Sequence, residues 1–317
     1  MRLFTLLFLL LTAPLLAAEN PFEAPEALKS FAQHQTRGHL DVPAKLSHLV
    51  RAFFAPVEEG GLGMTYDNSY TRTVSEGYRD RKANCFTMTA MYIACGQSIG
   101  VDAQFAESLR ISHWRRAGAT ILYERHYVAV MGYGSIGLAR VADFLPEVRQ
   151  GVHRLVRIHR QQALAVFFSN RAVELLNTAH PKEALASART SVEIDPSYGG
   201  GWNVLGVVLE EQLQVKEAEF SFCKAMSQNT RDGISCGNLE WLLLSQGREK
   251  EAQACRDRAL ETCKKNPYYN AFLAQEALSE NQWDEAEKRM KVALGILPHE
   301  PEFLLIHARI CLAQGLQ

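Results

Sequence analysis

Three residues have the side chains, and the order along the chain, of a nucleophile, a base and an orienting acid: Cys85, His126 and Asp143. In such a site a thiolate attacks a carbonyl carbon, an imidazole moves the proton, and a carboxylate holds the imidazole in place. Each residue alone also has a structural explanation, because a cysteine at a helix start usually packs in a core and a strand histidine is usually satisfied locally. The hypothesis therefore depends on the elements that position the three side chains.

Cys85 stands at the start of a predicted buried helix. Residues 85, 88, 89, 92, 93 and 96 recur at helical spacing after Asn84, and Gly100 is a stop signal. In the first turn of a helix, unpaired backbone N–H groups and the helix dipole favour a thiolate and could also hold an oxyanion. We expect the Cys85 N–H to be one oxyanion donor, with Tyr66 or Asn68 as candidates for a second, although both residues also suit a turn.

His126 and Asp143 fall on two alternating segments joined by a glycine-rich stretch, which predicts a β-hairpin. If the hairpin folds between Gly134 and Ser135, paired residue numbers sum to 269, and His126 then lies opposite Asp143. Directly opposed side chains have Cβ atoms about 5 Å apart, which is close enough for a carboxylate to orient an imidazole. A slip of one residue would move Asp143 to the other face.

A zinc site is an alternative explanation of the same residues. Cys85, His113, His126 and Asp143 are all ligand types that zinc accepts. The closely spaced ligand pairs that usually mark zinc sites are missing, so the sequence predicts no metal and no other cofactor.

The segment from Gly61 to Pro146 resembles the transglutaminase-like superfamily. The resemblance is carried by Asn84-Cys85 opening a helix, by "SIGVDAQF", by "ERHYVAV" around the histidine and by "VADF" around the aspartate. It implies a papain-like α+β fold in which Cys85 is the nucleophile, His126 the base and later acid, and Asp143 the orienter. Ala83 departs from the family, which commonly has glycine there. The resemblance leaves hydrolysis and transfer to a second amine equally open.

The second half repeats itself every 34 residues. Ala184, Ala218, Ala252 and Ala286 are in register, as are Ser191, Ala225, Ala259 and Ala293. Small residues at fixed helical spacing let two helices approach closely. The pattern resembles the tetratricopeptide repeat (TPR), most clearly in the second unit: Trp202, Leu205, Gly206, Leu209, Ala218, Phe222 and Ala225. Arg171 replaces the usual leucine in the first unit, Glu240 replaces a small residue in the third, and the glycines at 199–201 are expected to form a turn.

The resemblance implies that the first helix of each unit lines a groove for a protein or peptide partner. The candidate groove residues by register are Asn203, Val207, Trp241, Leu244, Tyr268 and Gln275. The same apolar surface could instead pack on the first half of the chain, since exposed apolar patches are normally covered.

The N-terminal segment, the cysteine count and the net charge of the chain indicate its location and its class of partner. Residues 1–18 carry one positive residue, a short apolar run and small residues at 17 and 18, which is typical of a secretory signal peptide. No later segment is long and apolar enough to span a membrane, so we expect an exported, periplasmic protein. Seven cysteines then leave at least one thiol unpaired or bridged to another chain. With 34 Lys and Arg against 35 Asp and Glu, no overall charge favours nucleic acid.

Together these patterns predict an α+β papain-like, transglutaminase-like domain over 19–148, a linker helix over 149–164, and an all-α TPR solenoid over 165–317. The solenoid is expected to hold four repeats and a terminal capping helix. The predicted function is an exported thiol acyl-transfer enzyme, a cysteine protease or amidase or a transglutaminase, with repeats that dock a partner or substrate. The alternative is a TPR scaffold with an inactive first domain. The substrate, the disulfide pattern and the oligomeric state are left open.

Overall fold

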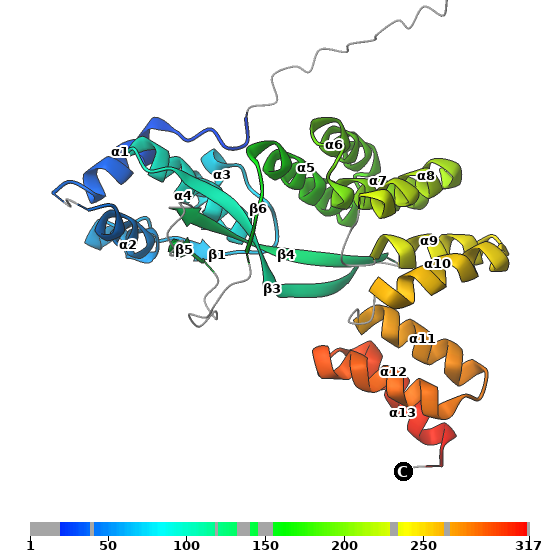
Figure 1. Cartoon of the computed structure of the whole chain (residues 1–317). Coiled ribbons are helices and arrows are strands. Elements are labelled where there is room, and N and C mark those ends of the chain that lie inside the picture. The colour runs from blue at the N-terminus through cyan, green and yellow to red at the C-terminus, as the bar shows by residue number, and fades with distance from the viewer. Residues whose placement is uncertain are drawn as a thin grey trace, which may run out of the picture.

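The computed structural model describes residues 20–38, 41–117, 120–131, 140–144, 155–228, 234–262 and 267–315. Within these ranges, the side chains of residues 109–124, 140 and 258–262 lie outside the description. The predicted signal peptide and the glycine-rich stretch of the predicted hairpin also lie outside the described residues. Helices predominate in the described chain, and Figure 1 shows them gathered around one sheet and then in a stacked array.

The helices of the first half surround one central helix. They are α1 (Glu26–Gln35), α2 (Val42–Phe54), the short 3-10 helix η1 (Val57–Glu59), α3 (Val74–Asp80) and the central α4 (Cys85–Ser98). Nearly every residue of α4 is buried, as expected for a helix that is apolar on all sides. The neighbouring α3 approaches α4 closely at Gly77, where a Cβ atom would lie 3.0 Å from Met91 Sδ and from Thr87 Cγ2. Gly77 therefore permits the close contact of these two helices.

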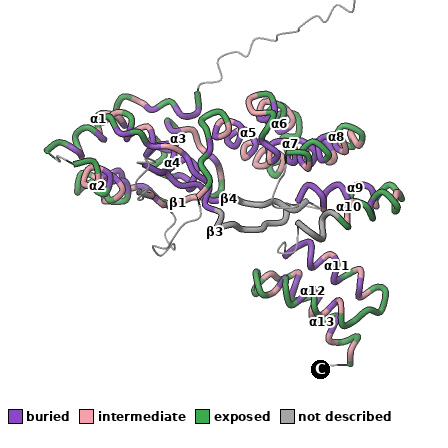
Figure 2. The backbone as a smooth tube through the Cα atoms, viewed as in Figure 1, coloured by how far each residue is buried: buried purple, intermediate pink, exposed green. Residues whose placement is uncertain are grey.

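A four-stranded antiparallel sheet lies against α4. Its order is β5 (Arg140–Ala142), β4 (Thr120–Met131), β3 (Ala103–Ala117) and β6 (Leu155–Arg157), and a separate parallel pair joins β1 (Thr65–Tyr66) to β2 (Lys82–Ala83). One face of the sheet contributes Phe105, Tyr127 and Ala129 to the core around α4, together with Phe144 just beyond β5. The core of the first half is thus built around the central helix and this face of the sheet, with buried side chains from α1, α2 and the later helix that begins at Arg160 also contributing (Figure 2).

The linker helix predicted over 149–164 is wrong at residues 155–159, whereas residues 160–164 are helical. Residues 155–157 form β6, which pairs with β3 at Ala106–Ser108, and helix α5 begins only at Arg160. The pairing partner is about fifty residues earlier in the chain. Because this contact is non-local, the local run of arginines could not predict it.

The second half consists of helix pairs with a constant offset. They are α5 (Arg160–Asn177) with α6 (Pro181–Ile194), α7 (Gly199–Glu211) with α8 (Val215–Ser227), α9 (Ile234–Ser245) with α10 (Glu249–Thr262), α11 (Pro267–Ser279) with α12 (Trp283–Ile296), and a final α13 (Pro301–Ala313). The second helices begin at 181, 215, 249 and 283, which are 34 residues apart. The glycines at 199–201 begin α7 rather than forming a separate turn, which corrects the prediction for them.

The turn inside each helix pair also repeats. A left-handed backbone conformation occurs at Ala179, Leu213, Gly247 and Asn281, again at intervals of 34. Glycine is the residue best suited to this conformation, yet it occupies only one of the four positions, so the fold imposes the turn on the other three. The aligned alanines at 184, 218, 252 and 286 are buried between the helices. The predicted 34-residue repeat is therefore confirmed.

Candidate functional site

Cys85 is the first residue of α4, as predicted. The side chain of Asn84 caps the helix, because its Oδ1 accepts a hydrogen bond of 2.9 Å from the Thr87 N–H. The helix is held to the sheet nearby, where Thr89 Oγ1 donates to the carbonyl oxygen of Tyr127 over 3.1 Å. Cys85 is buried and takes part in no disulfide, and the same holds for Cys95 on the same helix. The cap and the sheet contact thus fix the position of the sulfur.

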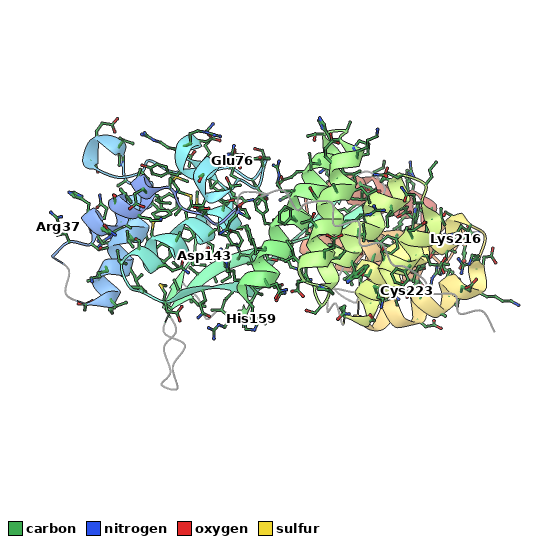
Figure 3. All side chains as sticks on the ribbon, turned by 90° about the horizontal axis from the view of Figure 1, so that it is seen from above. Arg37, Glu76, Asp143, His159, Lys216 and Cys223 are labelled. Atoms are coloured by element: carbon green, nitrogen blue, oxygen red, sulfur yellow. The ribbon has the colours of Figure 1, made fainter. Side chains whose placement is uncertain are left out.

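The expected contact between His126 and Asp143 is present. The distance from His126 Nε2 to Asp143 Oδ1 is 2.8 Å, and both residues lie beside the core of the first half. Figure 3 shows Asp143 in this part of the molecule, well apart from Lys216 and Cys223 on α8. An aspartate at this distance can fix the orientation of the imidazole ring.

The register that produces this contact differs from the predicted one. β4 and β5 pair Ala129 with Ala142 and Val130 with Val141, so paired numbers sum to 271 and not 269. Asp143 is therefore displaced by two positions from the place directly opposite His126. Since side chains alternate with a period of two, a shift of two residues keeps Asp143 on the same face, and diagonal neighbours remain within reach of long side chains.

The thiol of Cys85 is the second neighbouring group that raises the pKa of His126, so the two side chains lie close together. Because Nε2 faces Asp143, the other ring nitrogen, Nδ1, is the one left for the sulfur. Burial alone would lower the pKa of His126, but the interactions with Asp143 and Cys85 outweigh it and raise the pKa to about 9. At neutral pH the imidazole is thus held in its charged form beside the sulfur.

Cys95 gives a contrast within the same helix. Burial raises the pKa of its thiol to about 12, which makes it an inert core residue. The two cysteines of α4 therefore differ in what lies beside them, and only Cys85 has an imidazole partner.

An irregularity of the sheet lies next to the histidine. Ser108 of β3 pairs directly with His126, and the register between β3 and β4 shifts immediately afterwards. Register shifts of this kind often occur beside functional sites, where they redirect a side chain. The Ser108 hydroxyl is buried and has no hydrogen-bond partner among the described residues. No local pattern in the sequence marks this shift, so Ser108 could not be predicted as a neighbour of the site.

The two candidates for a second oxyanion donor lie near the start of α4. Tyr66 pairs with Ala83 in the β1–β2 ladder, two residues before Cys85, whereas Asn68 is exposed in the following loop. Tyr66 is therefore the better placed of the two.

The described residues contain no group of three or more histidine, cysteine or acidic side chains arranged to hold a metal ion. His113, which the zinc alternative requires, has a side chain outside the description. Among the helices that the structure describes, none combines the length and apolar character of a membrane span.

The predicted groove is only partly open. Asn203, Val207 and Tyr268 are buried: Asn203 accepts a hydrogen bond of 3.1 Å from Asn238, and the Tyr268 hydroxyl donates to Glu300 over 3.1 Å. The side chains of these three residues pack between helices and leave little surface for a partner. Trp241 is 46% exposed and Gln275 is exposed, while Leu244 is half-buried.

Part of the inner surface of the repeats is in contact with the first half. Strand β4 packs against α9, and β3 packs against α5. Figure 1 shows the long β3–β4 ribbon running from the side of α4 toward α9. The packing on the protein's own first half, which the sequence left open, therefore occurs at these helices.

The comparisons with known proteins concern the repeats. No protein-family model matches the chain, and no curated protein sequence matches it. Similar solved structures include YrrB, described as a TPR protein with an unusual peptide-binding site, with 20% identity and a TM-score of 0.34 over 48% of this chain and 87% of that one. Another is TTC0263, a thermophilic TPR protein of Thermus thermophilus, with 23% identity and a TM-score of 0.38 over 50% and 92%. A third is pilF of Pseudomonas aeruginosa, with 20% identity and a TM-score of 0.40 over 48% and 69%.

The second half has the TPR fold. This assignment depends on the 34-residue spacing of helices, left-handed turns and buried alanines.

Proposed function

We propose that the first half is a transglutaminase-like, papain-like thiol site that transfers the acyl group of a protein or peptide amide. The observation that carries the proposal is the arrangement of His126, whose Nε2 lies 2.8 Å from Asp143 Oδ1 and whose pKa is raised by both Asp143 and the nearby thiol of Cys85. A buried imidazole between a thiol and a carboxylate is the arrangement that thiol acyl transfer needs.

The proposed reaction proceeds in two steps. The Cys85 sulfur, its proton transferred to His126, forms a bond to the amide carbonyl carbon, and the resulting oxyanion lies at the N-terminus of α4, where the backbone N–H groups point. The C–N bond then breaks, the amine leaves with the proton of the imidazolium, and a thioester remains on Cys85. Attack by water completes hydrolysis, whereas attack by a second amine forms a new amide.

The repeats are proposed to dock a protein or peptide segment, and the chain is proposed to act after export to the periplasm. Solenoids of this kind present extended surfaces to partners. The exposed Trp241 and Gln275 are the groove candidates that remain available.

A scaffold without catalysis is the second candidate, and two observations favour it. The repeat fold is typical of proteins that bind other proteins. In addition, Cys85 is 9% exposed and His126 is 3% exposed, so little of either side chain is open to a substrate.

Alkylation of the folded protein separates the two candidates. With iodoacetamide near pH 7, and modification located by mass spectrometry, an activated Cys85 should react faster than the exposed Cys223 despite its burial. His126→Ala should slow the reaction of Cys85 about tenfold or more and leave Cys223 unchanged, since a positioned base contributes at least that much. Cys85 reacting more slowly than Cys223, and unaffected by His126→Ala, would support the scaffold.

A further inference from the structure

Two polar residues of the first repeat occupy positions that are apolar in the second and third repeats. Arg171 aligns with Leu205, and Glu174 aligns with Val208, which is buried in the repeat core. The guanidinium of Arg171 lies 4.0 Å from the centre of the Tyr70 ring, and its Nη1 lies 3.4 Å from Glu174 Oε2. Both departures from the repeat pattern therefore face the loop that precedes α3.

A chain of hydrogen bonds leads from Glu174 to the start of α4. Glu174 Oε1 accepts from the Thr71 N–H over 2.6 Å, and Thr71 Oγ1 accepts from Asn84 Nδ2 over 3.0 Å. Asn84 Oδ1 in turn accepts from the Thr87 N–H over 2.9 Å, which is the cap of α4. Asn84 directly precedes Cys85, so three bonds connect a helix of the repeats with the position of the thiol.

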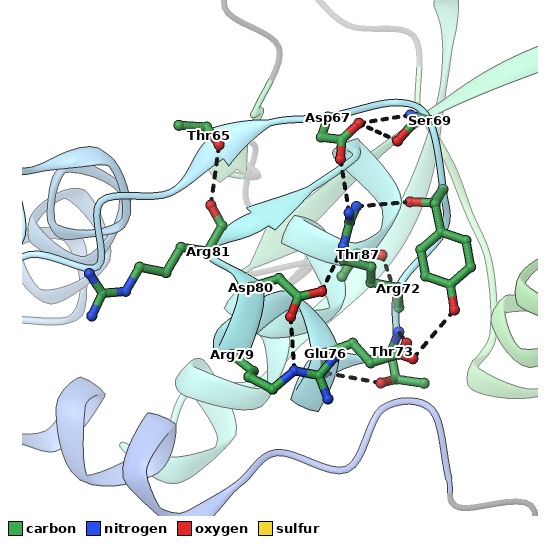
Figure 4. A network of polar contacts seen from close by, with 11 residues as sticks. Thr65, Asp67, Ser69, Arg72, Thr73, Glu76, Arg79, Asp80, Arg81 and Thr87 are labelled. Atoms are coloured by element: carbon green, nitrogen blue, oxygen red, sulfur yellow. Dashed lines mark hydrogen bonds and ion pairs between the residues drawn. The ribbon is translucent and has the colours of Figure 1, made fainter.

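The loop is held on its other side by the first half itself. Arg72 forms ion pairs with Asp67 at 2.9 Å and with Asp80 at 3.3 Å, and its carbonyl oxygen accepts from Thr87 Oγ1 over 2.7 Å (Figure 4). Arg72, with these contacts, directly follows Thr71, whose N–H donates to Glu174. The contacts of Arg72 fix the loop to α4, and on the adjacent residue Glu174 accepts from the Thr71 backbone N–H.

A second contact joins the repeats to the strand that carries His126. Tyr127, the residue after His126, lies close to Tyr198, which precedes α7: burial raises the pKa of the Tyr127 hydroxyl and the neighbouring Tyr198 raises it further. Tyr127 is buried, and a Cβ atom on Gly200 would lie 2.5 Å from the Tyr198 ring, so glycine is needed there to leave room for that ring. The strand that carries the histidine and the helix that carries the cysteine are thus both attached to the repeats.

We propose that Glu174 is a positioning residue for Cys85, acting through Thr71 and Asn84, and that the first repeat is thereby a structural part of the thiol site. This inference rests on the proposed function for its chemical consequence. It differs from a simple docking role, because removing the contact should change the reactivity of the thiol and not only the attachment of the two halves.

The test compares four variants of the full chain: Glu174→Ala, Glu174→Gln, Thr71→Val and, as a control, Glu183→Ala, an exposed glutamate on α6. The readouts are the alkylation rate of Cys85 and hydrogen exchange of the amides in the first turn of α4. Loss of a helix cap corresponds to about a fivefold change in equilibrium, so we expect Glu174→Ala to slow alkylation and speed amide exchange by about that factor. Glu174→Gln keeps an acceptor oxygen for Thr71 and should resemble the native chain, as should Glu183→Ala.

Thr71→Val removes the Oγ1 acceptor and should reproduce the effect of Glu174→Ala. The double variant should show much less than the sum of the two effects, because both interrupt one chain of contacts. Native rates of alkylation and exchange in folded Glu174→Ala would overturn the inference, and if that variant fails to fold, native rates in Thr71→Val would do so. If native Cys85 is unreactive but exchange in α4 still responds to Glu174, the proposed enzyme fails while the positioning role stands.

Discussion

Replacing Asp143 with asparagine tests the electrostatics of the site. Asp143 lies 2.8 Å from His126 Nε2, and its hydrogen bond is the main contribution that raises the pKa of His126. Asparagine has nearly the same shape but no charge, so it keeps the packing and removes the attraction for a proton on the imidazole. We therefore expect Asp143→Asn to lower the pKa of His126 from about 9 toward its usual value.

The expected loss of stability in Asp143→Asn follows from the pKa shift of His126. A rise from 6.5 to about 9 corresponds to roughly 3 kcal/mol in favour of the charged imidazole, of which Asp143 and Cys85 supply the attractive part. A histidine whose pKa is higher in the folded than in the unfolded state contributes stability that is complete below pH 6.5 and is lost as the pH rises through 9. The destabilisation by Asp143→Asn should accordingly be about 1–3 kcal/mol at pH 6 and decrease toward pH 10.

Two measurements check this expectation. The titration of His126 by NMR should move to a lower pH in Asp143→Asn, and the difference in unfolding free energy between native and variant chains should shrink as the pH rises. Asp102→Asn, which removes an exposed carboxylate from the same half, serves as the control and should leave both unchanged. A native His126 that titrates near 6.5, or a stability difference that does not vary with pH, would refute the reasoning.

Further predictions concern the repeats. Gly206→Ala should destabilise the chain by about 1–3 kcal/mol in thermal unfolding, because its Cβ would lie 2.5 Å from the Phe222 ring. Gly295→Ala, in a helix position with nothing within 4 Å, should be neutral or stabilising by comparison. Arg256→Met should cost about 3 kcal/mol, since it leaves the buried carboxylate of Glu240, 2.6 Å from the guanidinium, without its ion pair. Because burial raises the pKa of Glu240, this cost should be larger at pH 8 than at pH 5, and a cost independent of pH would contradict the assignment.

Much of the repeat array could be predicted because its signals are local. The buried alanines and the helix starts recur every 34 residues, and each unit contacts mainly its neighbours. The exposure of the groove candidates could not be predicted in the same way. Val207 and Tyr268 share the register of groove positions, but their burial depends on side chains from other helices, which spacing along one helix does not reveal.

In the candidate site, too, the features with local signals could be predicted from the sequence and the non-local contacts could not. The sequence by itself determined that Cys85 begins a buried helix, because Asn84 is a strong helix cap and the apolar spacing follows it directly. It also determined that His126 and Asp143 share a face, because strand parity survives a shift of two residues. The register itself, the strand at 155–157 and the bond from Glu174 to Thr71 were decided only by the tertiary structure. Each of these contacts joins residues far apart in the chain. Such a contact stabilises the protein only after the elements that carry the residues have packed together.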